Sequence, residues 1–267
     1  MIGYVKEKKD KTFKRKILDV AIAFIVPICV LIFWEFAVKI GLVKATLVPP
    51  PTKLWSTFIS LVETGKLQKG LLISFSRVIS GFFIGTVSGT VIGFLMGLFE
   101  PFNKALSIIV SVLRPIPTIA LIPIFIIIFG IGETSNISII VVGSFWPVLL
   151  NTISGIQSVD NKLLELAYVY GIGDFKTVFK IILPSAVTSM ITGIRLALGT
   201  AWMSVVAAEM IGASSGIGYM IMYARELAQT ANMYVCVLVI GLIGLALDKI
   251  LLFVQKKTTN KFKGITV

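Results

Sequence analysis

The sequence predicts an all-α integral membrane protein with six transmembrane helices, and three observations lead to this fold class. Hydrophobic residues make up 56% of the 267 residues and charged residues only 14%, which is too apolar for a water-soluble domain of this length. The apolar residues gather in nearly uncharged runs of about 20 residues, long enough to cross a bilayer as helices. Lysines and arginines gather at the two ends of the chain, as they do in segments that flank membrane helices and stay in the cytoplasm.

The apolar runs define one domain, residues 17–254, between two basic tails, residues 1–16 and 255–267. The six spans are expected, in order, at 17–38, 78–99, 105–129, 137–156, 186–208 and 233–254. A basic start followed by an apolar run is also typical of a signal peptide. Because this run is long enough to span and no small-residue cleavage site follows it, we expect an uncleaved first helix. Prolines interrupt three of the spans, at Pro27, Pro115, Pro117, Pro123 and Pro147.

An even number of spans places both termini on one side, the cytoplasm. The segment 157–185 then lies inside, and the loops 39–77, 130–136 and 209–232 lie outside. Loop 39–77 departs from the positive-inside rule, because it carries five lysines and Arg77 against Glu63 alone; the rule is a bias that the first helix usually dominates. Much of the net charge of +12 lies in the tails, which indicates topology signals in contact with anionic lipid and no nucleic-acid partner.

The outer loop 39–77 has its own organisation. Pro49, Pro50 and Pro51 form a stiff, extended stretch. Thr52 is expected to cap a short helix that Gly65 ends. One side of this helix is apolar, so we expect it to lie at the outer membrane surface.

The second span has a glycine at every fourth position: Gly81, Gly85, Gly89, Gly93 and Gly97. Each step of four residues advances the helix by about 40° beyond a full turn. The glycines therefore form a slowly winding groove in which another backbone can come close. Plain helix packing is the favoured interpretation; a dimer contact or a sliding contact used in gating stays open. A nucleotide-binding loop is excluded, because no Gly-Lys-Ser/Thr motif occurs in the chain.

The segment between spans four and five reads ELAYVYGIGDFKTVFKIILP at 165–184. Asp160 can cap a helix over 161–170, whose apolar residues recur at i, i+3, i+4 and i+7, and Gly171 can end it. Asp174 can cap a second helix of the same periodicity. Pro184 either ends this helix or opens the next one, the fifth span. The periodicity predicts a helix–turn–helix on the cytoplasmic face, lying on lipid or docking a soluble partner.

This segment resembles the EAA loop of permease subunits of bacterial ABC importers. The family pattern of Glu-x-Ala, a glycine and then Ile-x-Leu-Pro is met by Glu165, Ala167, Gly171, Ile181, Leu183 and Pro184. Leu166 stands where the family usually has the middle alanine of Glu-Ala-Ala. LRPIPTIALIP at 113–123, GIRLALGTAW at 193–202 and AEMIGASSGIGYMI at 208–221 resemble the nitrate/sulfonate/taurine branch of these permeases.

The resemblance implies the ABC importer permease fold in a bacterial plasma (inner) membrane. The loop 157–185 would hold a coupling helix that sits in a cleft of a cytoplasmic P-loop ATPase, present in two copies. The implied coupling residues are Glu165, Ala167, Gly171, Asp174, Leu183 and Pro184. Glu165 can add a charge-assisted contact and Gly171 allows the close turn. The chain itself would be no enzyme and bind no cofactor, because ATP and Mg belong to the ATPase.

Two further partners are implied: a second permease copy, which we expect to form a homodimer although a heterodimer stays open, and an extracytoplasmic substrate-binding protein. The solute would be small and anionic, such as a sulfonate, taurine or nitrate. The expected pathway residues are charges or helix breaks inside spans, namely Arg114, Pro115, Pro117 and Arg195, and Glu209 near the outer end of the fifth span. Internal pairing of the two arginines is the alternative. By resemblance, Gly212, Gly216 and Gly218 contribute to the outer gate.

Other function classes have less support. A self-contained secondary transporter would show inverted repeats or ionisable relays, and a vitamin-binding membrane subunit of an energy-coupling complex would lack the EAA pattern. The chain has no histidine, and its two cysteines, Cys29 and Cys236, lie inside apolar runs. We therefore expect no metal site, no structural disulfide and no catalytic constellation.

Overall fold

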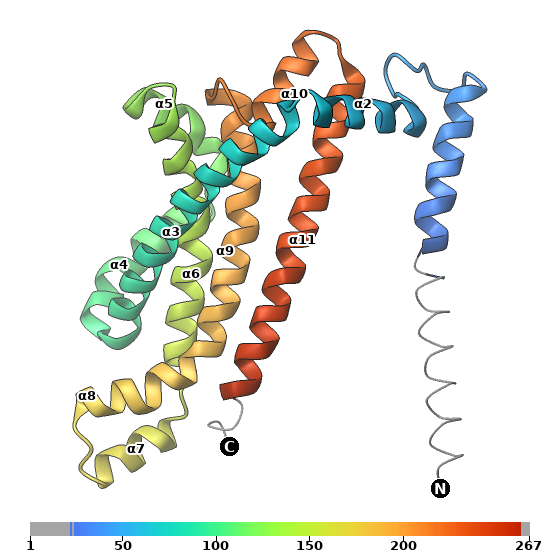
Figure 1. The fold of residues 1–267 in the computed structure, drawn as a ribbon. Coiled ribbons are helices and arrows are strands. Elements are labelled where there is room, and N and C mark those ends of the chain that lie inside the picture. Colours follow the sequence, from blue (N-terminus) through green and yellow to red (C-terminus); the bar gives the residue numbers. More distant parts are fainter. Residues whose placement is uncertain (1–21, 23, 263–267) are drawn as a thin grey trace, which may run out of the picture.

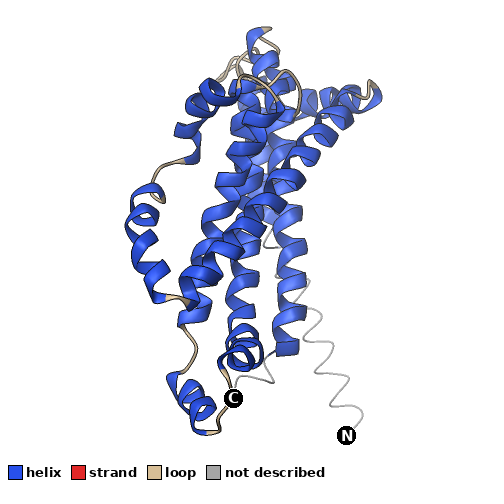
Figure 2. Ribbon diagram, turned by 90° about the vertical axis from the view of Figure 1, so that its left-hand side faces the viewer, coloured by secondary structure: helices blue, strands red, loops and turns tan. Residues whose placement is uncertain are grey.

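The fold is all-helical over the part of the chain that the structure, a computed structural model, describes: residue 22 and residues 24–262 (Figures 1 and 2). A first helix covers residues 24–39. The elements that follow are α2 (Pro51–Glu63), α3 (Lys66–Leu98), α4 (Glu100–Leu113), η1 (Thr118–Leu121), α5 (Ile122–Phe129), α6 (Glu133–Gln157), α7 (Asn161–Val169), α8 (Asp174–Thr177), η2 (Val178–Ile182), α9 (Leu183–Gly212), α10 (Ile217–Glu226) and α11 (Thr230–Phe262). The predicted basic tail 1–16 and the start of the first predicted span lie outside the described residues.

Four helices in the described part are long and apolar enough to cross a membrane: α3, α6, the continuous stretch Asp174–Gly212, and α11. A fifth candidate arises if α4 and the η1–α5 pair together count as one broken span. These helices correspond to the second to sixth predicted spans. The prediction of an all-α, multi-pass membrane protein is thus confirmed, and the count of six remains a prediction.

The second span begins earlier than predicted. α3 starts at Lys66, so the outer loop ends at Gly65 and Arg77 lies within a helix. The prediction failed because Lys66, Lys69 and Arg77 interrupt the apolar run that was used to find the span. Among the described residues, Arg77 is buried against acidic side chains of other helices, which offsets the cost of its charge inside the helix.

The glycines of α3 pack against α6 within the same chain. A Cβ atom built at Gly81 would lie 2.6 Å from the Cβ of Ile140, and one at Gly89 would lie 2.8 Å from the carbonyl oxygen of Phe145. Gly85, Gly93 and Gly97 meet α6 equally closely. The stripe therefore allows two helix backbones to approach, as plain helix packing requires.

α6 also packs along α9, and a proline shapes this contact. Pro147 inside α6 has no N–H to donate to the carbonyl of Gly143. Thr200 on α9 fills this place, because its hydroxyl donates to the Gly143 oxygen at 2.7 Å. The bundle of α3, α6 and α9 is thus joined by close backbone contact on one side of α6 and by a hydrogen bond on the other.

The third predicted span is sharply broken. Pro115 and Pro117 lie between α4 and η1, and the helices on either side are bent by 89°. Pro123, which was expected to interrupt the span, instead lies in the first turn of α5, where a missing N–H costs nothing. Figure 2 shows the bent pair standing away from the bundle along one side of the molecule.

α2 runs across one end of the molecule, between the first helix and α3 (Figure 1). Its predicted cap was wrong: the side chain of Thr52 does not cap the helix. The carboxylate of Glu35 caps α2 instead, because it accepts hydrogen bonds from the backbone N–H of Thr52 at 3.2 Å and from its hydroxyl at 3.1 Å. Gly65 follows the helix in the left-handed conformation, as predicted.

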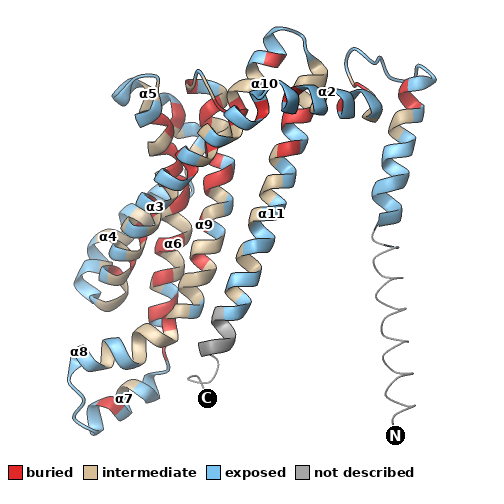
Figure 3. Cartoon of the chain, viewed as in Figure 1, coloured by how far each residue is buried: buried red, intermediate tan, exposed pale blue. Residues whose placement is uncertain are grey.

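Burial follows the central bundle. Figure 3 shows buried residues on the facing sides of α3, α6 and α9, whereas α4, α7 and α8 are largely exposed. α7 and α8 lie at one end of the molecule, here named the hairpin end, and α2, α5 and α10 lie at the other, here named the opposite end (Figure 1).

Candidate functional site

At the hairpin end, the local sequence fixes the first helix as predicted. Asp160 caps α7, since its side-chain oxygen accepts a hydrogen bond from the backbone N–H of Lys162 at 2.9 Å. The helix ends before Gly171, which has a φ of +65°. The N–H of Ile172 then donates to the carbonyl of Ala167 at 2.9 Å. A left-handed glycine at this point satisfies the last carbonyls of the helix and reverses the chain.

The second half of the hairpin differs from its prediction. Asp174 was expected to cap a regular helix, but the cap position is Gly173 and Asp174 lies in the first turn. There its charge still complements the helix dipole. After one turn the chain enters a π-helical segment, η2, and continues without a break into α9. Pro184 lies in the first turn of α9 and so opens the fifth span, one of the two predicted alternatives.

The apolar side chains of the hairpin are not covered by the described part of this chain. Ala167 is buried, but Tyr168 is 87% exposed and Phe175 77% exposed. Others share this exposure: Leu166, Val169, Tyr170 and Phe179. Phe175 and Phe179 pack against each other, with ring centroids 4.6 Å apart. Glu165 is exposed beside this patch. Several exposed aromatic residues on one short hairpin are typical of an interface.

At the opposite end, a buried ion cluster joins α3, α6 and α9. We name it the Arg77 cluster: Ser74, Arg77, Glu133, Glu209 and Ser215. The Arg77 guanidinium donates to Glu209 Oε1 at 2.8 Å and to Glu133 Oε2 at 2.8 Å, and forms a further ion pair with Glu133. It also donates to the backbone oxygen of Ser215 at 2.7 Å. The Arg77 and Glu209 side chains are 3% and 0% exposed, while Glu133 is 62% exposed.

Glu209 also organises the start of α10. Its carboxylate accepts a hydrogen bond from the backbone N–H of Gly218 at 2.9 Å and from the hydroxyl of Ser74 at 2.8 Å. The Ser74 oxygen in turn accepts from the N–H of Ile217 at 3.0 Å. The first N–H groups of a helix lack partners within it and favour negative charge. The cluster therefore supplies both the partners and the charge.

The three glycines predicted for the outer gate lie in and beside the turn between α9 and α10: Gly212 ends α9, Gly216 lies in the turn and Gly218 is in the first turn of α10. Gly216 has a φ of +108°, and a Cβ there would collide with the Glu209 carboxylate. A Cβ at Gly218 would lie 2.5 Å from the carbonyl oxygen of Val206, and one at Gly212 would lie 3.0 Å from Ile126 on α5. Small residues thus let this turn close onto α9 and α5. A role in gating remains a proposal.

The two arginines of the predicted pathway have different surroundings. Arg195 pairs with Asp248 on α11, with Nη2 to Oδ1 at 2.9 Å, and donates to Gln255 at 3.3 Å. This geometry fits the internal-pairing alternative. Arg114 lies at the C-terminal end of α4, at the break made by Pro115 and Pro117; it is exposed and forms no ion pair with any residue that the structure describes.

Sequence reasoning missed three polar residues at the opposite end. Arg77 was placed in a loop, and Glu133 and Asn136 were not singled out. Asn136 is 1% exposed, and neither its amide nitrogen nor its oxygen has a hydrogen-bond partner. The available signal was that Arg77, Glu133 and Glu209 lie beside apolar runs, since charges that become buried there require partners. Among the described residues, no group of three or more Cys, Asp, Glu or His side chains could hold a metal ion.

Comparisons with known proteins agree with this architecture. Residues 89–263 match the family described as "Binding-protein-dependent transport system inner membrane component". A Bacillus subtilis permease protein named for aliphatic sulfonates transport, SsuC, is 37% identical over 90% of this chain and 88% of its own length. The taurine transport system permease protein TauC of Escherichia coli is 30% identical over 85% of this chain and 84% of its own length. An inward-facing structure of the MetNI methionine ABC transporter has a TM-score of 0.62 at 20% identity, covering 75% of this chain and 97% of that one.

Proposed function

Because the chain belongs to the family of binding-protein-dependent transport system inner membrane components, we propose that it is the permease subunit of an ATP-driven ABC importer. The sulfonate and taurine relatives agree with the branch that the sequence motifs indicated. In this proposal the chain forms the translocation pathway and catalyses no reaction. ATP and Mg are bound by a separate P-loop ATPase present in two copies.

The observation that carries the proposal is the hairpin of α7 and α8. It presents an uncovered aromatic patch, a capped helix and a glycine turn, all at one end of the molecule. Because η2 continues into α9 without a break, a force on the hairpin would be transmitted to a spanning helix. A flexible loop could not do this. The π-helical turn is a further point at which the helix can adjust, since such turns are frequent at functional sites.

We assign the hairpin end to the cytoplasm, with both termini, and the opposite end to the outer face. With the first helix included, the chain then crosses the membrane six times. A second permease copy, for which we propose a homodimer, and an extracytoplasmic substrate-binding protein complete the assembly. On the outer face the Arg77 cluster holds α10 and its glycine turn against α9, which supports an outer gate that moves as a unit.

For the solute we propose a small anion of the sulfonate or taurine type. The unpaired Arg114 supports this, because it lies at a proline break in a membrane helix, where backbone groups can line a cavity. A guanidinium matches the geometry of a sulfonate or carboxylate. Glu209 is enclosed by its partners, which favours a structural role over solute contact.

Purification of the tagged chain from its native membranes in a mild detergent tests the proposal. Co-purifying proteins are identified by mass spectrometry for the wild type and for a Glu165→Lys, Gly171→Asp variant. Glu63→Lys is the matched control, because Glu63 is an exposed glutamate on α2 at the opposite end. We expect a P-loop ATPase with the wild type and the control, and its loss with the double variant. A chain that purifies without an ATPase in every case would contradict the proposal and favour a self-contained transporter.

A further inference from the structure

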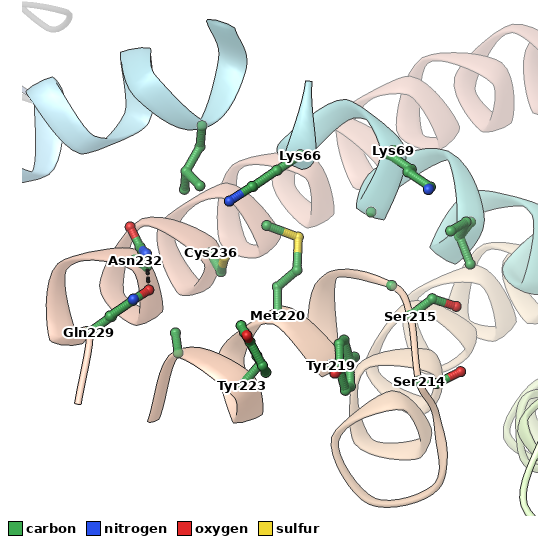
Figure 4. Close-up of a pocket in the computed structure, with 15 residues that line it drawn as sticks. Lys66, Lys69, Ser214, Ser215, Tyr219, Met220, Tyr223, Gln229, Asn232 and Cys236 are labelled. Carbon is green, nitrogen blue, oxygen red and sulfur yellow. Dashed lines mark hydrogen bonds between the residues drawn. The ribbon is translucent and has the colours of Figure 1, made fainter. Parts of the chain in front are cut away.

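A pocket of about 440 Å³ lies at the opposite end, between the start of α3, the glycine turn, α10 and the start of α11 (Figure 4). It is separate from the proline break at Arg114 and from the hairpin. Its volume falls in the range of small-molecule sites, roughly 300–1,000 Å³. None of the functions proposed above assigns it a ligand, although the glycine turn of the proposed outer gate forms one of its walls.

The polar part of the pocket is rich in hydrogen-bond donors and carries positive charge. Lys66 and Lys69 line it from the first turn of α3, and neither forms an ion pair with any described residue. No acidic side chain is among the described lining residues. On the α11 side, Asn232 donates to Gln229 Oε1 at 2.6 Å, which leaves the Gln229 N–H groups as donors. Figure 4 shows the two lysine nitrogens on opposite sides of Met220, with that of Lys69 toward the Ser215 side.

The rest of the lining combines the hydroxyl-bearing residues Ser214, Ser215, Tyr219 and Tyr223 with apolar side chains. Ile73, Met220, Ala224 and Cys236 contribute to the apolar part, and they come from α3, α10 and α11. A site for a bare inorganic ion would surround the ion with donors. A site with apolar surface beside two ammonium groups instead fits an anion that carries an apolar body.

The pocket is held in shape by the Arg77 cluster. Ser215 and Gly216 form one wall, and Arg77 fixes Ser215 through its backbone oxygen at 2.7 Å and its hydroxyl at 3.0 Å. On the α3 side, Gly70 leaves room for Met220, since a Cβ there would lie 2.6 Å from the Met220 sulfur. A pocket that is already formed loses little affinity to ordering its own side chains.

We propose that this pocket binds an organic oxyanion, whose charged head pairs with the ammonium group of Lys66 or Lys69 and whose apolar part packs on Ile73 and Met220. The anion is either a dissolved alkyl oxyanion or the head of an anionic phospholipid, since both present the same chemistry. The site would also give a role to two of the five lysines of the outer segment that depart from the positive-inside rule. The proposal concerns the chain alone and does not depend on ATPase coupling.

The test measures binding to the full chain in nanodiscs of phosphatidylcholine, by calorimetry with sulfate, ethanesulfonate and pentanesulfonate. Sulfonates keep their charge at every pH of interest. We expect pentanesulfonate to bind most tightly, with roughly fourfold tighter binding for each buried methylene. The variant Lys66→Ala, Lys69→Ala should bind at least about tenfold more weakly, because charge-assisted hydrogen bonds are lost. Lys66→Arg, Lys69→Arg should retain binding, and Lys53→Ala on α2, whose lysine does not line the pocket, should not change it.

A second arm distinguishes the source of the anion. Native mass spectrometry counts phosphatidylglycerol molecules retained by the chain from mixed phosphatidylcholine–phosphatidylglycerol nanodiscs. Retained phosphatidylglycerol that is lost with Lys66→Ala, Lys69→Ala assigns the pocket to lipid, whereas sulfonate binding without retained lipid assigns it to a dissolved anion.

Three results overturn the proposal. The first is that neither probe binds. The second is that the Lys66→Ala, Lys69→Ala variant binds as well as the wild type. The third is that this variant only weakens capture of the substrate-binding protein, which would make the lysines a protein contact. Both lysines are exposed, so the variant is expected to fold.

Discussion

Replacement of Arg77 by methionine should destabilise this protein more than any replacement of an exposed charge. Met keeps much of the length of the side chain and removes the guanidinium. Glu209 would then remain 0% exposed, with hydrogen bonds from Ser74 and the Gly218 N–H but without a cation. Removing one partner of a buried ion pair costs about 3–5 kcal/mol. Glu133 adds little to this cost, because it is 62% exposed and water can solvate its charge.

Replacement of the other partner of this ion pair, Glu209, should lower the stability less. Glu209→Gln leaves Arg77 paired with Glu133 and bonded to Ser215, so we expect a loss of about 1–3 kcal/mol. Lys104→Met is the matched control, because Lys104 forms an ion pair with Glu100 in which both side chains are more than three-quarters exposed. Such a pair contributes about 0.5 kcal/mol or less.

The assay is unfolding of the purified chain in mixed micelles, titrated with denaturing detergent and followed by circular dichroism. The expected order of stability loss is Arg77→Met, then Glu209→Gln, then Lys104→Met. An Arg77→Met variant that unfolds together with the Lys104→Met control would refute the view that the cluster holds the opposite end together.

Two further predictions concern the central bundle. Gly89→Ala should lower the free energy of unfolding by about 1–3 kcal/mol, because its Cβ would lie 2.8 Å from an α6 carbonyl oxygen that cannot move aside. Gly241 on α11 has open space around it, so Gly241→Ala should be neutral or slightly stabilising in the same titration. Thr200→Val should lower the free energy of unfolding by about 1–3 kcal/mol, because the carbonyl of Gly143 on α6, which receives no hydrogen bond from Pro147, would lose its donor. Thr200→Ser keeps the hydroxyl and should keep most of the stability. Equal stability of the Val and Ser variants would show that the hydroxyl does not contribute.

The hairpin was predictable because its signals are local. The cap at Asp160 and the glycine at 171 act within a few residues of the helix that they bound. The glycine stripe of α3 was likewise recognised from its spacing alone. The π-helical turn was not predicted, because the periodicity of residues 175–182 reads as an ordinary α-helix.

The Arg77 cluster was not predictable in the same way. Arg77 meets Glu133 across 56 residues and Glu209 across 132. A single sequence shows that each charge needs a partner but not which partner the fold brings close. The same limit applies to Glu35, which caps α2 in place of Thr52 from 17 residues away. The break at Pro115 and Pro117 was visible in the sequence, but the bend of 89° was not.

Photo-cross-linking in the native membrane shows whether the hairpin of α7 and α8 contacts a cytoplasmic ATPase. A benzophenone amino acid replaces Tyr168, which is 87% exposed at the hairpin end, or Trp55, which is 66% exposed on α2 at the opposite end. We expect the probe at Tyr168 to yield a covalent product with a P-loop ATPase and the probe at Trp55 to yield none. Cross-links from Tyr168 to lipid alone, with no ATPase product, would contradict the proposed contact.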